Sequence, residues 1–160
     1  MERTTSGAGR HESEEERLDR NLQELLQELR VALPGVQVLF AFLLVVPFNQ
    51  RFPQITNFQQ TIYFVTLLLA TGATCFLIAP TVHHRIQFRE QDKERIVMTA
   101  NRFTIVGMVL LAAAMTGAIL LITDILYRET TVTIVAGAVA LMFALLWYAV
   151  PLRRSLQSDS

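Results

Sequence analysis

The apolar residues of this chain gather into long stretches that contain no charged side chain. No Asp, Glu, Lys or Arg occurs in residues 31–50, 52–84, 103–123 or 130–152. About 20 helical residues cross the hydrocarbon core of a bilayer, so each stretch is long enough for a membrane span. The second stretch is too long for one span and divides into a polar loop followed by a span. The pattern predicts four spans, at residues 31–48, 61–82, 103–123 and 131–150.

The segment before the first span has the pattern of an amphipathic helix. Five leucines share one helical face over residues 14–30: Leu18, Leu22, Leu25, Leu26 and Leu29. Because a bilayer offers the backbone no water to bond, the spans must be helical as well. We therefore expect an all-α protein, an integral membrane four-helix bundle with a cytoplasmic amphipathic helix at its N-terminus. Residues 1–13 are rich in Gly, Ser and Thr and are expected to be disordered.

The charge of the amphipathic helix bears on what it contacts. Residues 14–30 hold six acids and three arginines, whereas the loop at residues 84–102 holds five basic and three acidic residues. Helices that lie on a membrane surface usually have a basic polar face, which this helix lacks. We hypothesise that it docks on that loop, in the same chain or in a neighbouring subunit. The candidate docking surface consists of Glu24, Glu28, Arg85 and Arg89. The alternative, an interfacial helix without a protein partner, stays open.

Pro34 and Gly35 stand where the amphipathic helix meets the first span. Proline removes the hydrogen bond back to Arg30 and glycine loosens the turn, so we predict a helix elbow at these two residues. Gln37 follows and is the one carboxamide within a predicted span. It has two interpretations: a hydrogen bond between packed helices, or part of a polar ring that lines a pore in an oligomer.

The positive charges predict the orientation of the chain. Twelve of the fourteen Lys and Arg residues lie in the N-terminal segment, the second loop and the C-terminal tail, and two lie in the other loops. Positively charged segments stay in the cytoplasm. Both termini, including the tail at residues 151–160, are therefore expected to be cytoplasmic in a multi-pass protein of the cell membrane.

Composition and chemistry then narrow the function. The chain has 160 residues, of which 52% are apolar, and no net charge; with its charges so segregated, this excludes a soluble enzyme, a nucleic-acid binder and a disordered chain. The spans lack the ionisable residue that proton and sodium carriers generally need. Adjacent histidines such as His83 and His84 point about 100° apart on a helix and make no two-ligand metal face. Phosphate-binding and hydrolase motifs are absent, so we expect no enzyme, metal or cofactor.

Small and aromatic residues suggest how the spans pack. Ala113 and Gly117 form a ridge that lets helices approach closely, and Ala136, Ala140 and Ala144 form another. Tyr63 stands where an outer belt of aromatic residues is expected, and Trp147 where the inner belt is.

Several segments resemble a known family. They are RLDRNL (17–22), ELLQELRV (24–31), GVQ (35–37), LFAFLL (39–44), IAP (78–80) and ANR (100–102). Together they resemble a family of small four-span bacterial membrane proteins catalogued as a domain of unknown function, over residues 17–123. The resemblance implies the topology and a bacterial cell membrane, and it supplies no catalytic or binding residue. Some members have an automatic sodium:proton antiporter label, which conflicts with the missing intramembrane carboxylate.

These observations predict a non-enzymatic accessory or structural component of the membrane, which acts through helix packing and its cytoplasmic face. Its partners are the lipid bilayer and either a second copy of itself or another membrane protein, with no nucleic acid. The alternative is an ion channel or cation/proton transporter formed by a homo-oligomer, for which ions would be the ligands.

Overall fold

The structure, a computed structural model, describes residues 14–50, 52–86, 93–127 and 129–149. The tails predicted at residues 1–13 and 151–160 lie outside this range. The elements are α1 (Glu14–Val45), the 3₁₀ turns η1 (Val46–Phe48) and η2 (Phe52–Gln54), α2 (Asn57–Ile86), α3 (Lys93–Leu126), α4 (Glu129–Phe143) and the π-helical turn η3 (Ala144–Ala149). The described residues are thus all-α, as predicted, and four of the helical segments are long and apolar enough to cross a membrane.

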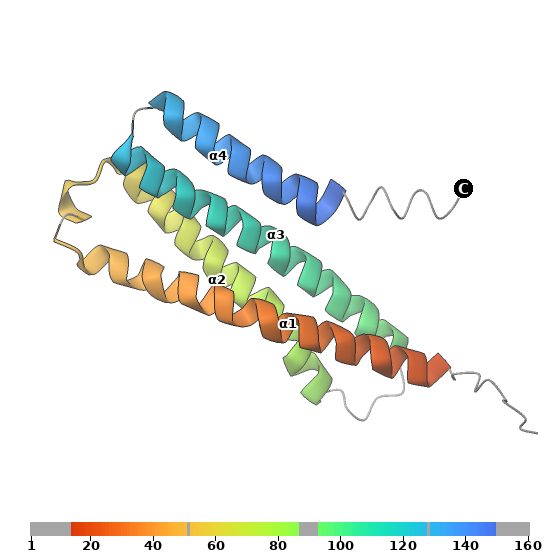
Figure 1. The fold of residues 1–160 in the computed structure, drawn as a ribbon. Helices are drawn as coiled ribbons and strands as arrows, with labels where there is room; N and C mark the ends of the chain where they lie inside the picture. The colour runs from red at the N-terminus through yellow and green to blue at the C-terminus, as the bar shows by residue number, and fades with distance from the viewer. Residues whose placement is uncertain (1–13, 51, 87–92, 128, 150–160) are drawn as a thin grey trace, which may run out of the picture.

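The first helix combines two predicted elements. α1 covers both the amphipathic segment and most of the first predicted span, with Pro34 inside it, and Figure 1 shows it as one ribbon. Proline removes one backbone hydrogen bond, but the turns on either side of it continue the helix. The division at residue 30 therefore falls inside a helix, and the bend expected at Pro34 and Gly35 stays a prediction.

The buried residues of α1 recur every seven positions. Leu22, Leu29, Val36 and Leu43 are all 8% exposed or less. On α2 the buried positions alternate in steps of three and four residues: Tyr63, Thr66, Ala70, Ala73, Leu77 and Pro80. A seven-residue repeat is 3.5 residues per turn, the spacing of helices that wrap around each other with a left-handed supercoil. In the structure this repeat packs α1 against both α2 and α3, through two buried clusters.

Small residues hold α2 and α3 close together. A β-carbon placed on Gly107 would lie 2.7 Å from Cγ of Leu77 and 3.2 Å from its backbone nitrogen. Ten residues further along α3, Gly117 lies against the Thr66 hydroxyl. Ala114 is fully buried in a cluster with Ala70. The α2–α3 interface therefore depends on small residues. They include Gly117, which belongs to the predicted ridge on α3.

The fourth helix packs on one side of the other three. Among the four long helices of the described residues, α1, α2 and α3 contact one another, whereas α4 contacts α3 only; Figure 1 shows α4 on the far side of α3 from α1. On α4, Val132 and Ala136 are buried, while Ala140 and Ala144 of the predicted ridge are exposed. The fold is a three-helix core with a fourth helix on one side, a more open arrangement than the predicted four-helix bundle.

Candidate functional site

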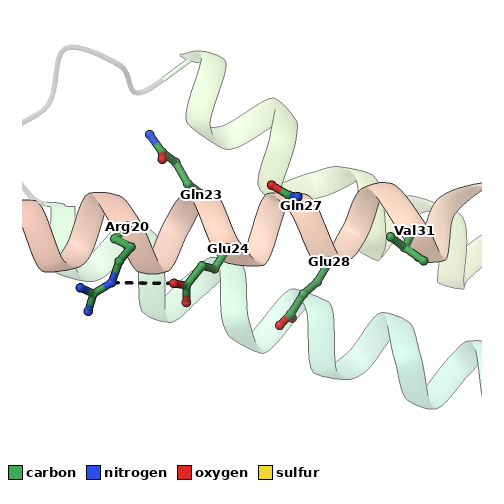
Figure 2. A pocket seen from close by; sticks show the side chains of 6 residues that line it. All are labelled: Arg20, Gln23, Glu24, Gln27, Glu28 and Val31. Carbon is green, nitrogen blue, oxygen red and sulfur yellow. Dashed lines mark ion pairs between the residues drawn. The ribbon is translucent and has the colours of Figure 1, made fainter.

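The N-terminal half of α1 presents a polar face to solvent at the end of the molecule where α2 finishes and α3 begins, here called the α2–α3 end. Six exposed residues of this face line a shallow hollow of about 530 Å³: Arg20, Gln23, Glu24, Gln27, Glu28 and Val31. Figure 2 shows Glu24 and Glu28 on one side of α1, and Gln23 and Gln27 on the other. The face therefore offers carboxylates along one edge and carboxamides along the other.

Arg20 and Glu24 form an ion pair on this face. Nε of Arg20 lies 3.7 Å from Oε1 of Glu24, and both side chains are more than half exposed. Exposed ion pairs one helical turn apart contribute little to stability, about 0.3–0.5 kcal/mol. The position of the polar face therefore depends on the packing of the opposite, leucine-rich side of α1.

Beneath it, the leucine face of α1 packs on protein. Leu29 is 2% exposed and belongs to a buried cluster with Ala73 and Leu77 of α2 and Leu111 of α3; Leu25 and Leu26 pack against the same cluster. One α-helical heptad earlier, Leu22 is also buried. The helix contacts both α2 and α3. The amphipathic segment therefore docks on its own chain through apolar contacts.

The predicted docking surface is described only in part. Glu24 and Glu28 are exposed on α1. Arg85 belongs to the last turn of α2, but its side chain lies outside the described residues, as does the whole of Arg89. Among the described ion pairs, none joins α1 to Arg95 or Arg102 of α3. Docking of α1 through these charges stays a prediction.

Gln37 lies on the outside of the helical core. Its neighbour Val36 is fully buried, whereas Gln37 itself is exposed, as are Pro34 and Gly35. Among the described residues, no hydrogen bond is made by the Gln37 side chain. Both interpretations of Gln37, a bond between packed helices and a polar ring in an oligomer, stay predictions.

The opposite end of the molecule, where α1 leads to α2, has a hydrogen-bonded clamp. Thr56 caps α2: its hydroxyl accepts the N–H of Gln59 at 3.2 Å, and the Gln59 Oε1 accepts the N–H of Thr56 at 3.0 Å. This reciprocal pair is a capping box. Nε2 of Gln59 also donates to Oδ2 of Asp124 on α3, at 2.8 Å. One carboxamide thus both starts α2 and ties it to the end of α3.

Tyr63 makes a second link near the same end. Its hydroxyl donates to the backbone carbonyl of Leu43 at 2.9 Å, in a buried position. In a continuing α-helix that carbonyl accepts the N–H of residue 47, and residue 47 is a proline without one. The tyrosine therefore supplies the donor that Pro47 lacks. Its ring packs edge-on against Phe52, with centroids 5.3 Å apart.

Residues with metal-binding chemistry do not gather within the part of the chain that the structure describes. No group of three or more His, Cys, Asp or Glu lies close enough there to hold an ion. His83 and His84 belong to the last turns of α2, but their side chains lie outside the described residues.

A family model matches residues 11–151, which are nearly the whole chain; its description is a family of unknown function, DUF6328. The chain belongs to this family. The match includes all four helices, the Gln59–Asp124 clamp and the bond from Tyr63 to Leu43. Comparisons with curated proteins and with solved structures found no match.

Sequence reasoning missed the clamp and the tyrosine link of this family member. The Thr-x-x-Gln spacing at residues 56–59, just before an apolar run, is a signal for a capping box. The freed carbonyl four residues before Pro47 is another readable signal. Nothing in the sequence indicates that Asp124 and Tyr63 complete these two groups, since their partners are distant along the chain.

Proposed function

We propose that this chain is a non-enzymatic component of the bacterial cell membrane that crosses the bilayer four times. Four apolar helices support the crossings. The excess of Lys and Arg in the segments at the α2–α3 end supports a cytoplasmic placement of that end and of both termini. In this placement the polar face of α1 meets the cytoplasm, and the Gln59–Asp124 clamp lies on the outer side.

The observation that carries the proposal is the composition of the core. The buried polar side chains of the described residues are Thr66 and Thr123, with no ionisable group other than the tyrosine hydroxyl that bonds to Leu43. A coupling ion needs a site within the membrane to bind and release it. Packed apolar residues fill the space between α1, α2 and α3. These features favour a protein that acts through its surfaces.

In this proposal the polar face of α1 binds the partner protein. The face is acidic at Glu24 and Glu28, exposed, and set on a helix whose other side is anchored by Leu22 and Leu29. A rigid scaffold under a charged face suits recognition of a membrane protein with a basic cytoplasmic segment.

Gln37 favours a second candidate function. A homo-oligomer that gathered the Gln37 side chains around an axis would have a polar ring within the membrane, and ions would pass between the chains. This is the channel or transporter alternative, and flux measurements distinguish it from the first proposal.

The test begins with the full chain in proteoliposomes. We expect no flux of sodium, potassium or protons above that of empty vesicles. In cells, Glu24→Lys with Glu28→Lys should abolish co-purification of a membrane partner, while Gln60→Lys, exposed at the opposite end, should preserve it. Ion flux that Gln37→Leu reduces would replace the first proposal with the second.

A further inference from the structure

Beside the buried positions of α1 runs a second stripe of residues that also follows a seven-residue repeat. Its positions alternate in steps of four and three residues and are all exposed: Gln23, Gln27, Arg30, Pro34, Gln37 and Ala41. Gln23, Arg30 and Gln37 each directly follow a buried residue of the first stripe, so the two stripes lie about 100° apart around the helix. Among the described residues, no helix buries this second stripe, which we call the glutamine stripe.

The stripe holds every glutamine of α1. Those are Gln23, Gln27 and Gln37, and Figure 2 shows Gln23 and Gln27 leaving the helix on the same side, away from Glu24 and Glu28. Positions spaced by four and three residues are the ones that meet when two parallel helices pack as a coiled coil. The stripe therefore has the geometry of a helix–helix contact and polar residues where such contacts define register.

The hydrogen-bonding needs of Gln37 indicate which partner packs on the stripe. In the proposed membrane placement it lies near the centre of the first span, and no described residue of its own chain bonds to its side chain. A carboxamide in hydrocarbon without a partner is costly, because no water replaces the lost bonds. A carboxamide has both a donor and an acceptor, so the most economical partner at the same depth is another carboxamide.

We propose that a second copy of this chain docks on the glutamine stripe, with the two α1 helices parallel and the Gln37 side chains hydrogen-bonded to each other across a two-fold axis. Such an axis along the membrane normal places identical residues at identical depth. Ala41 and Pro34, which flank Gln37 on the stripe, have little side-chain bulk and let the two helices approach closely. The acidic edge at Glu24 and Glu28 faces away from this contact and stays accessible to another protein.

The proposal rests on the membrane placement given under the proposed function, but it has a separate test. In a Cys75→Ser background that keeps Gln37, single cysteines are introduced at Ala41, which lies on the stripe, and, as the control, at Phe42. Phe42 is 71% exposed and lies about 100° further around the helix than Ala41. Oxidation in vesicles of phosphatidylethanolamine and phosphatidylglycerol should cross-link Ala41→Cys into dimers, even when lipid is added in excess. Phe42→Cys should give only collisional cross-links that fall with dilution.

The hydrogen bond is tested in the native sequence with sedimentation equilibrium in detergent. A hydrogen bond between membrane helices predicts that Gln37→Leu raises the dimer dissociation constant about three- to thirty-fold. Gln37→Asn, which keeps the carboxamide, should stay closer to the native value. Because residue 37 is on the outside, Gln37→Leu should keep the native helix content, measured by circular dichroism.

Equal cross-linking at residues 41 and 42, or a dissociation constant that Gln37→Leu leaves unchanged, would overturn the dimer. The outcome for the proposed function is read separately. Ion flux combined with a specific cross-link at Ala41→Cys would reject the accessory role and keep the dimer. Absence of flux with no cross-link would reject the dimer and keep the accessory role.

Discussion

At the scale of single residues, two polar side chains form hydrogen bonds with backbone groups that lack a helical partner. The Tyr63 hydroxyl bonds to the Leu43 carbonyl, which Pro47 leaves without its helical donor. Gln59 bonds to the backbone at the start of α2 and to Asp124 on α3. Both residues lie where helices end and chain direction changes, and both join elements that are distant in sequence.

Tyr63→Phe should destabilise the fold by about 1–2 kcal/mol, because it leaves a buried carbonyl without a donor. Pro47→Ala restores a backbone N–H four residues after Leu43. The double variant should therefore lose less stability than the sum of the two single changes. Thermal unfolding in detergent, arranged as a double-mutant cycle, measures the difference. Strict additivity would show that the tyrosine bond is unrelated to the proline.

The two roles of Gln59 are separable by substitution. Gln59→Glu keeps an acceptor for the capping box but loses the amide donor and sets a carboxylate against Asp124, so it should weaken the α2–α3 link alone. Gln59→Ala should cost more, about 1–2 kcal/mol, because it also removes half of the cap. Asp124→Asn, which retains an acceptor oxygen, is the matched control. An identical melting temperature for Gln59→Ala and the native chain would contradict the clamp.

At the scale of elements, close contact between α2 and α3 depends on where glycine occurs along the helix. Gly107 lies under Leu77, whereas a β-carbon on Gly137 of α4 would meet nothing within 4 Å. Both residues are helical, so the same substitution at each position separates packing from helix propensity.

Gly107→Ala should destabilise the protein by about 1–3 kcal/mol, because Leu77 and its backbone must move to admit the methyl group. Gly137→Ala should leave stability unchanged or raise it by up to about 1 kcal/mol through helix propensity. Unfolding of the two variants under the same detergent conditions gives the comparison. Equal effects would mean that the α2–α3 helices are not in the close contact described.

The docking of the amphipathic segment is also a property of elements. It rests on leucines, so Leu22→Ala should increase amide hydrogen exchange in the N-terminal turns of α1, with a loss of about 2–3 kcal/mol of local stability. Asn21→Ala, exposed one residue earlier and outside both stripes, should leave exchange unchanged. Charge reversal at Arg102 should have a small effect as well. A larger effect of Arg102→Glu than of Leu22→Ala would favour docking through charges.

At the scale of the whole molecule, α1, α2 and α3 form a core and α4 packs on one side of it through α3. α1 and α3 contain 32 and 34 residues, so at 1.5 Å per residue they are about 48 and 51 Å long. That exceeds the roughly 30 Å of a hydrocarbon core, and in the proposed membrane placement the excess includes the docked segment at the α2–α3 end. α4 is shorter and, among the long helices described, contacts α3 only.

This arrangement predicts that α4 detaches before the core unfolds. Trp147 is the single tryptophan of the chain; it packs beside Phe143, with ring centroids 4.8 Å apart, and against the cluster around Leu29. On heating in detergent, its fluorescence should shift at a lower temperature than the loss of helix seen by circular dichroism. Coincident transitions would show that the four helices unfold as one unit.

The sequence alone determined the four apolar spans and their helical structure, because a charge-free run of about 20 residues is typical of a membrane span and a bilayer permits few other structures. It also determined which leucines of residues 14–30 share a face, since helical geometry is local. These predictions hold in the structure: four long apolar helices are present, and Leu22 and Leu29 are buried.

Only the tertiary structure decided how those helices meet. The continuity of α1 depends on packing on both sides of Pro34, and the attachment of α4 depends on its contact with α3. The bonds from Gln59 to Asp124 and from Tyr63 to Leu43 join residues that are 20 or more positions apart in the sequence. Gln37 shows the limit most clearly. Its polarity is written in the sequence, but its place on the outside of the core is a result of which face of α1 the other helices cover.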